Sequence, residues 1–331
     1  MGNLKKMKRI AHRTEKVLLF VRELSSISKK DIALAGGKGA SLGDLMRAGL
    51  PVPAGFVVTA AAFDRFLEEN ELLEDIDAQL SRVNYKDTNS IDRASNVIRA
   101  LILEAPFPKD LRQEVIKFFG TLNTSFVAVR SSATAEDSKT ASWAGELETY
   151  LNTIAKTLFA NIQKCWASLF SPRAIFYRHE KRLHRVKVSV AVVVQAMVES
   201  EVAGIAFTVH PVTKDKNQMI IEAGWGLGEA VVSGQITPDS YVLHKKDYSV
   251  IDLHTARQEK KLVRNQKGNG DCWVSVPKKL RTKQKLTTAQ IKTLAELCMR
   301  VERHERFPCD IEWALVRGKF YLLQSRPITT L

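Results

Sequence analysis

The stretch CDIEWALVRGKFYLLQSR, residues 309–326, decides the fold because apolar and polar residues alternate on both sides of a turn. Arg317-Gly318-Lys319 has the composition of a three-residue hairpin loop, with a glycine available for the left-handed position. Closing strands are therefore predicted over 309–316 and 320–325. The register set by this loop predicts three cross-strand pairs: Val316 with Phe320, Glu312 with Gln324, and Asp310 with Arg326.

The two faces of this predicted hairpin differ in polarity. One face is apolar and is predicted to be core, and it comprises Ile311, Trp313, Leu315, Tyr321 and Leu323. The other face carries Asp310, Glu312, Gln324 and Arg326 at the end away from the turn. A carboxylate opposite a carboxamide offers two oxygen ligands for a Mg²⁺ ion shared with phosphates and water. Arg326 lies one pleat further, within reach of a phosphate; the alternative is a polar outer face with an Asp–Arg ion pair.

A glycine-rich turn, Gly36-Gly37-Lys38-Gly39, precedes a helical pattern that runs to Gly49. Glycines let backbone N–H groups converge on an anion, and the following helix N-terminus favours negative charge. Lys38 would then be a point charge for a phosphate. The spacing is not that of a Walker A loop, and the alternative is a simple turn with a solvated lysine.

The run VAVRSS, residues 127–132, predicts a strand over 126–129 that delivers Arg130 into a polar loop. An arginine at the end of a strand can hold phosphate oxygens with two parallel hydrogen bonds. The alternative is an ion pair with the nearby Glu136 or Asp137. The glycines of GWGLG, residues 224–228, lack the dinucleotide-binding spacing and indicate a tight loop near the ligand.

Strands and helices are interspersed along the chain with short connections, which is typical of an α+β or mixed α/β fold. Residues 71–120 have a largely helical pattern, and 256–285 is basic, polar and predicted to be rich in loops. Further helices are predicted over 60–70, 153–183 with a break near Pro172, and 288–305. Further strands are predicted within 17–30 and over 56–58, 188–194, 204–209, 219–222 and 241–244.

Length and composition predict a soluble protein of two lobes or two packed domains. The chain has 331 residues and a formal charge of +14, which gathers partly in a basic N-terminal extension, residues 1–16. Aromatic residues are not interleaved with the basic runs, so a nucleic-acid partner is disfavoured. There is no apolar run long enough to cross a membrane. Four cysteines without a CxxC pair favour a reducing compartment, and we expect a cytoplasmic protein.

Five stretches together carry a family resemblance: GGKGASLGDLMRAGLPVPAGFVVT, FVAVRSSATAEDSKTASWAGELETYLN, VVVQAMVESEVAGIAFTVHPVT, IIEAGWGLGEAVVSGQITPDSY and DIEWALVRGKFYLLQSRPIT. They resemble the N-terminal ATP-binding domain of phosphoenolpyruvate synthase (pyruvate, water dikinase), which is shared with pyruvate phosphate dikinase and rifampicin phosphotransferase. The resemblance covers most of residues 17–329. It implies a two-lobed ATP-grasp fold, with an N-terminal lobe over 17–196 and a C-terminal lobe over 197–331 that carries the Mg²⁺-binding hairpin.

The resemblance also implies roles for individual residues. Lys38 and Arg130 would hold the triphosphate, Gln195 would lie beside the adenine, and Arg326 would contact a phosphate. Gly145 and Thr149 would belong to the phosphate-facing surface, and Glu312 and Gln324 would ligate Mg²⁺. Catalysis would rest on positioning and charge neutralisation by Lys38, Arg130 and Arg326, with no general base. Two positions depart from the family pattern: His210 replaces a more frequent Asp or Asn, and Glu146 replaces a frequent Gln.

Full-length members of the family continue with a swivelling domain whose histidine accepts phosphate, and with a domain that phosphorylates pyruvate or a drug. None of the seven histidines here lies in a comparable motif. We therefore expect this chain to pass phosphate from Mg·ATP to a histidine on a partner, and to be incomplete without it. The alternatives are the ATP-binding half of a rifampicin-type antibiotic phosphotransferase and a non-catalytic nucleotide sensor. Retention of the phosphate and Mg²⁺ residues disfavours the sensor.

Overall fold

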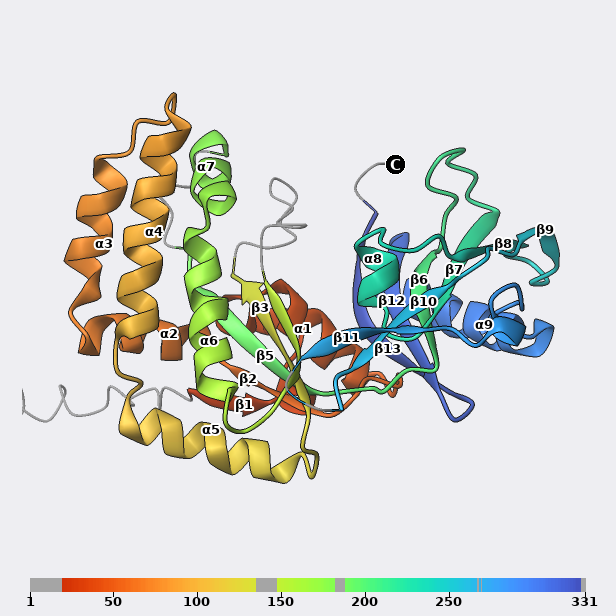
Figure 1. The fold of residues 1–331 in the computed structure, drawn as a ribbon, viewed down its shortest axis with the longest axis horizontal. Helices are drawn as coiled ribbons and strands as arrows, with labels where there is room; N and C mark the ends of the chain where they lie inside the picture. The colour runs from red at the N-terminus through yellow and green to blue at the C-terminus, as the bar shows by residue number, and fades with distance from the viewer. Residues whose placement is uncertain (1–19, 135–147, 182–187, 267, 269, 329–331) are drawn as a thin grey trace, which may run out of the picture.

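The computed structural model has two large antiparallel sheets, with helices packed around them, and a separate two-stranded sheet (Figure 1). It describes most of the chain, namely residues 20–134, 148–181, 188–266, 268 and 270–328. The predicted extension 1–16 and the residues Glu136, Asp137, Gly145 and Glu146 lie outside the described part. None of the described helices combines the length and the apolar character that a membrane span requires.

The first sheet has five strands in the order β1-β2-β5-β3-β4, and all neighbours are antiparallel. The strands are β1 (Val21–Glu23), β2 (Gly55–Val58), β3 (Val127–Ala133), β4 (Thr149–Thr153) and β5 (Val190–Ala196). The helices of this half are α1 (Ile32–Arg47), α2 (Ala60–Glu69), α3 (Leu72–Ser81), α4 (Thr88–Glu104), α5 (Lys109–Thr121), α6 (Leu158–Ala167) and α7 (Pro172–Glu180). The break predicted near Pro172 is confirmed, since Ser171 caps α7 and Pro172 takes its first turn.

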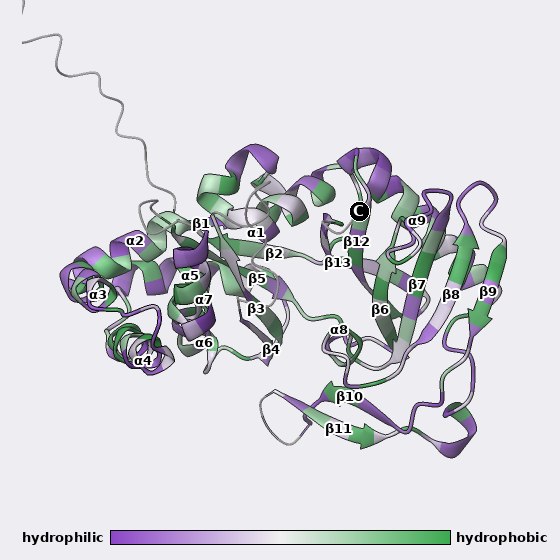
Figure 2. Cartoon of the chain, turned by 90° about the horizontal axis from the view of Figure 1, so that it is seen from above, coloured by the Kyte–Doolittle hydropathy of each residue, from purple (hydrophilic) through white to green (hydrophobic). Residues whose placement is uncertain are grey.

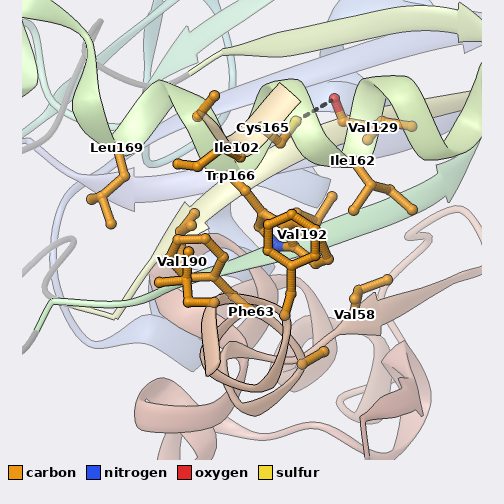
Figure 3. Close-up of a cluster of buried hydrophobic side chains, with 14 of the residues drawn as sticks. Val58, Phe63, Ile102, Val129, Ile162, Cys165, Trp166, Leu169, Val190 and Val192 are labelled. Atoms are coloured by element: carbon orange, nitrogen blue, oxygen red, sulfur yellow. Dashed lines mark hydrogen bonds between the residues drawn. The ribbon is translucent and has the colours of Figure 1, made fainter. Parts of the chain in front are cut away.

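Strand β5 is buried on both faces, which explains its unbroken apolar run VAVVV. Val190, Val192 and Val194 join the core formed with α2 and α6, where Phe63 and Trp166 lie with ring centroids 5.6 Å apart (Figure 3). Ala191 and Val193 pack on the opposite face against α1. The sheet is therefore a rigid central layer, with α1 and its glycine-rich turn held on one side.

The second sheet has six strands in the order β13-β12-β6-β7-β8-β9. They are β6 (Val202–Phe207), β7 (Gln218–Trp225), β8 (Asp239–His244), β9 (Val250–His254), β12 (Cys309–Val316) and β13 (Lys319–Pro327). Helix α9 (Thr288–Glu305) covers one face and has the predicted bounds, with a capping box between Thr287 and Gln290. Hydrophobic residues lie along the central strands, and polar ones lie on the outer turns (Figure 2). The short helix α8 (Glu229–Val232) follows β7.

The closing hairpin has a different turn from the predicted one. Val316 pairs with Lys319, so the loop is the two residues Arg317 and Gly318, whose φ angles of 49° and 74° are typical of a type I′ turn. This shifts the pairing by one residue, and Phe320 and Leu322 enter the core in place of the predicted Tyr321 and Leu323.

A bulge at Leu323 then restores the predicted pairing at the far end of this hairpin. Trp313 pairs with Leu322, but Glu312 pairs with Gln324 and Asp310 with Arg326, so Leu323 is the extra residue. Glu312 and Gln324 therefore lie side by side as predicted, although the loop that led to that prediction was wrong.

The segment predicted to be loop-rich contains a hairpin, β10 (Lys260–Arg264) and β11 (Asp271–Ser275). The segment that carries this hairpin, residues 256–285, is attached to the second sheet at both of its ends by one buried carboxylate, Asp239. The backbone N–H groups of Ala256 and Lys285 both donate to Asp239, each over 2.9 Å. The Lys285 ammonium lies 2.7 Å from Asp239 Oδ1, and neither side chain is exposed. Tyr241 donates to the same carboxylate over 2.7 Å, so burial and this hydrogen bond raise the pKa of Tyr241.

Ionic contacts join the end of α9 to Lys29, just before α1, and to Asp44, near the end of α1. Lys29 lies 2.7 Å from Glu305, and His304 Nε2 lies 2.6 Å from Asp44 Oδ2. Burial alone would raise the pKa of Asp44, but the hydrogen bond with His304 and the charge of Lys29 outweigh it and lower that pKa. These contacts fix α1, and with it the glycine-rich turn, relative to the second sheet.

Candidate functional site

A cavity of about 380 Å³ lies between the two sheets and receives side chains from both. This volume is typical of small-molecule sites. Every described residue predicted for the site lines this cavity: Lys38, Arg130, Thr149 and Gln195 from the first half, and Glu312, Gln324 and Arg326 from the second. Only the prediction for Gly145 falls outside the described residues.

Arg130 connects the two sheets at the centre of the cavity. It lies in the middle of β3, not in a loop after it, because the strand continues through Ser131 and Ser132 to Ala133. Its guanidinium donates to Gln324 Oε1 over 2.7 Å and to the Leu323 carbonyl, and it lies 3.3 Å from Glu312 Oε2. Leu323 is the bulged residue, so its carbonyl is turned out of the β12–β13 ladder toward Arg130. Arg130 is only 7% exposed, and these contacts compensate its buried charge.

Lys38 is held beside Arg130 by a close packing of the glycine-rich turn on β3. Gly36 has a φ of 67°, and a Cβ there would lie 2.2 Å from the Ser132 carbonyl oxygen. The Ser132 hydroxyl donates to the Ala35 carbonyl over 2.8 Å and accepts from the Gly39 N–H over 3.1 Å. Lys38 Nζ donates to the Ser131 carbonyl over 3.2 Å and lines the cavity. The turn therefore needs a glycine at position 36. It places the Lys38 ammonium on the carbonyl of Ser131, the residue that follows Arg130 in β3.

Glu312 and Gln324 supply oxygen atoms that converge on one point. Both lie within 3.3 Å of the same guanidinium nitrogen of Arg130, so a single cation is within reach of both side chains. In the described part of the chain, no group of three or more His, Cys, Asp or Glu residues is arranged to hold a metal. A Mg²⁺ ion commonly takes one or two protein oxygens and completes its shell with phosphates and water. The donor set therefore fits a cation shared with a polyphosphate.

Arg326 pairs with Asp310 and also lines the cavity. Its Nε donates to Asp310 Oδ2 over 2.8 Å, which is the ion pair of the alternative interpretation, and the same side chain lines the cavity. Burial raises the pKa of Asp310, and the charge of Arg326 partly offsets this. Asp310 therefore orients Arg326 at the edge of the cavity.

Gln195 lies at the other end of the cavity, where β5 leaves the first sheet. It is 2% exposed and donates to the Pro53 carbonyl over 3.2 Å. Ala196, the last residue of β5, also lines the cavity, as do Met197 and Val198, which begin the connection to β6. The lining next to Gln195 is therefore more apolar than the lining around Arg130 and Lys38.

Several cavity residues were not predicted. Leu151 and Met197 are apolar lining residues, and Glu229 is a carboxylate at the start of α8. Burial, and then the negative charge of Glu312, raise the pKa of Glu229. A signal for Glu229 was present, since it follows directly on the GWGLG run that was predicted to lie near the ligand.

His210 is compatible with the structure at a position where Asp or Asn is more frequent. Its Nδ1 accepts from the backbone N–H groups of Val212 and Thr213, over 3.3 and 3.2 Å. A carboxylate or amide oxygen caps a turn in the same way. The substitution therefore preserves the turn, and it lies away from the residues that line the cavity.

The fold is mixed α/β, with a cavity between two antiparallel sheets, and the family whose model matches this chain has the ATP-grasp fold. The family model described as "Pyruvate phosphate dikinase, AMP/ATP-binding domain" matches residues 32–331. The chain belongs to this family of ATP-binding domains.

Three relatives illustrate the family. The chain is 47% identical to a probable phosphoenolpyruvate synthase of Methanocaldococcus jannaschii, with 94% of this chain and 27% of that relative covered. It is 42% identical to a probable phosphoenolpyruvate synthase of Methanothermobacter thermautotrophicus, over 96% of this chain and 47% of the relative. It is 39% identical to a rifampicin phosphotransferase of Bacillus subtilis, over 93% of this chain and 36% of the relative. The chain thus spans less than half of these proteins, which contain further regions beyond the matched domain.

Proposed function

We propose that this chain is the ATP-binding, phosphoryl-donating part of a phosphoenolpyruvate synthase-like phosphotransferase. The observation that carries the proposal is the convergence of Lys38, Arg130, Glu312 and Gln324, from both sheets, on one cavity. Phosphoryl transfer depends mainly on positioning and on neutralising charge, and this constellation provides both. In this proposal, residues 17–196 and 197–331 are the two lobes that hold the nucleotide between them.

The polyphosphate lies at the Arg130 end of the cavity. Lys38, Arg130 and Arg326 neutralise phosphate oxygens, and Thr149, paired with Arg130 across β3 and β4, forms part of the phosphate-facing surface. Asp310 already orients Arg326, so little rearrangement is needed to present its donors. The Arg130 donors, by contrast, are engaged by Gln324 and Glu312 in this structure. Gly145 is proposed for the same surface from the resemblance alone.

The adenine lies at the Gln195 end, against Met197 and Val198. Glu312 and Gln324 would hold Mg²⁺, which would supply charge neutralisation to the phosphates. Because Arg130 now contacts the same two oxygens, its donors would turn to the phosphates when a cation occupies that place. The buried Arg130 guanidinium would then be paired both before nucleotide binding, with Glu312 and Gln324, and after it, with the phosphates.

The partner we propose is a swivelling domain with a histidine that accepts the phosphate and passes it toward pyruvate. The relatives support a partner in that they extend well beyond the matched domain. We also propose that the protein works in the cytoplasm. The rifampicin phosphotransferase of Bacillus subtilis supports one alternative, in which an antibiotic is the final acceptor.

A transfer assay tests the proposal. The chain is mixed with Mg²⁺, ATP labelled in its terminal phosphates and a purified histidine-bearing swivelling domain, and both acid-labile label and nucleotide products are measured. We expect label on the histidine with AMP and phosphate as products, and a loss of about 100-fold or more in Lys38→Ala, since that variant lacks a phosphate-facing charge. Nucleotide binding without label on the histidine is the result expected of a sensor, and it would contradict the proposal.

A further inference from the structure

The β10–β11 hairpin lies near α8 (Figure 2), and its side chains contact Asn152 of the first half and Glu199 of the connection between the sheets. We propose that it is a positioning element for the nucleotide, with Asp271 and Arg264 as positioning residues that act through the cavity wall. None of the described residues of this hairpin lines the cavity itself. The inference rests on the proposed function, because it treats the cavity as the ATP site.

Asp271 of β11 contacts the first sheet through Asn152. The Asn152 amide nitrogen donates to Asp271 Oδ1, and the Asn152 side chain is fully buried in β4. Asn152 has a φ of 49°, a left-handed conformation that asparagine tolerates better than most residues. Its neighbour Leu151 lines the cavity, as does Thr149 in the same strand. The contact therefore fixes the strand that forms this part of the wall.

Arg264 of β10 contacts the connection between the two sheets. Its guanidinium lies 4.2 Å from the ring centroid of Phe126, the residue before β3, and it forms an ion pair with Glu199. Glu199 lies in the segment from β5 to β6, whose residues Met197 and Val198 line the adenine end of the cavity. Arg264 thus joins the hairpin to the connection between the two sheets.

An apolar cluster behind the cavity wall completes the contact. Leu262 of β10 packs with Leu227 and Ala230, and Leu151 and Met197 pack against this cluster. The Leu227 N–H donates to the Leu262 carbonyl over 2.9 Å. A Cβ at Gly226 would lie 2.4 Å from that same carbonyl oxygen, so the approach depends on a glycine. Three cavity residues from three separate segments, Leu151, Met197 and Leu227, therefore share one apolar cluster with the hairpin residue Leu262.

A double-mutant cycle tests the Asn152–Asp271 contact. The variants are Asp271→Ala, Asn152→Gly, which keeps the left-handed backbone unstrained, and the two combined. The control is Trp273→Ala, which removes a contact within the hairpin, where Lys260 lies 4.3 Å from the Trp273 ring centroid. The measurements are the Kd of Mg·ATP by calorimetry and the Tm without nucleotide.

We expect Asp271→Ala and Asn152→Gly each to raise the Kd by about 10-fold. The double variant should raise it no further, because the two substitutions remove the same interaction. Asp271→Asn retains an acceptor oxygen at the same position, so it should bind within about threefold of wild type. Trp273→Ala should leave the Kd within about twofold, even where its Tm falls as much as that of Asp271→Ala.

If the fold-changes in Kd of the two single variants multiply in the double variant, the inference is overturned, because the two side chains then act independently. Equal losses in Trp273→Ala and Asp271→Ala would also overturn it, since general loosening would explain both. If Asp271→Ala does not fold, the comparison of Asn152→Gly with Asp271→Asn still tests the inference. A loss of Mg·ATP affinity in Asp271→Asn as large as that in Asn152→Gly would contradict it. A wild-type chain that does not bind Mg·ATP is a separate result, which refutes the proposed function.

Discussion

Asp239→Ala is expected to lower the free energy of unfolding by about 3–5 kcal/mol, because it leaves the Lys285 ammonium buried without its partner. Asp239 accepts hydrogen bonds from the Tyr241 hydroxyl, from the Lys285 ammonium and from the backbone at both ends of the segment 256–285. The variant therefore removes the point at which the β10–β11 hairpin is attached to the second sheet.

Urea unfolding monitored by tryptophan fluorescence checks this value. Asp252→Ala is the matched control, because Asp252 is an exposed acid in the neighbouring strand β9, and its effect should stay within about 0.5 kcal/mol. Asp239→Ala/Lys285→Met should recover part of the loss, since no unpaired charge then remains buried. A double variant less stable than Asp239→Ala would show that the unpaired ammonium is not the cause.

The second large effect is expected for catalysis. Arg130→Ala should lower the rate of phosphoryl transfer by about 1,000-fold, the usual range for an arginine that stabilises a transferring phosphoryl group. Arg130 is the residue that contacts both candidate metal ligands and the bulged Leu323 carbonyl. Arg130→Lys should recover little activity, because a lysine cannot reproduce the planar, branched set of donors.

The rate of AMP formation with the histidine-bearing partner is the measurement for these variants. Arg257→Ala serves as the control, because Arg257 is an exposed arginine that pairs with Glu259, and its rate should stay within about twofold of wild type. An Arg130→Ala enzyme that keeps a tenth or more of the wild-type rate contradicts the role given to Arg130.

The closing hairpin shows how far the sequence alone could lead. Alternation placed Glu312 opposite Gln324, and the structure has that pair. It could not distinguish a three-residue loop from a two-residue turn followed by a bulge, because Leu322 and Leu323 are both apolar and either can face the core. The decisive difference lies in the Leu323 carbonyl, which the bulge turns toward Arg130. The direction in which a backbone carbonyl points cannot be predicted from a hydrophobic pattern.

Long-range pairs were beyond prediction for a related reason. Arg130 was expected to contact either phosphate or the nearby acids, whereas its described partners are Glu312 and Gln324, far along the chain. Lys285 lies in a basic run that indicates a solvated surface, yet it is fully buried beside Asp239. The β10–β11 hairpin was missed because its charged sequence depends on contacts with both halves of the molecule. Helix α9 needed no such context, since its capping residues and apolar spacing are local.

A crystal structure of the chain with Mg²⁺ and a non-hydrolysable ATP analogue tests the central claim most directly. The account predicts a cation about 2.0–2.1 Å from a Glu312 carboxylate oxygen and from Gln324 Oε1, as is usual for Mg²⁺. It also predicts phosphates within hydrogen-bonding distance of Lys38 and Arg130. Nucleotide bound outside the cavity, or a cation held by other residues while Arg130 stays on Glu312 and Gln324, would contradict the account.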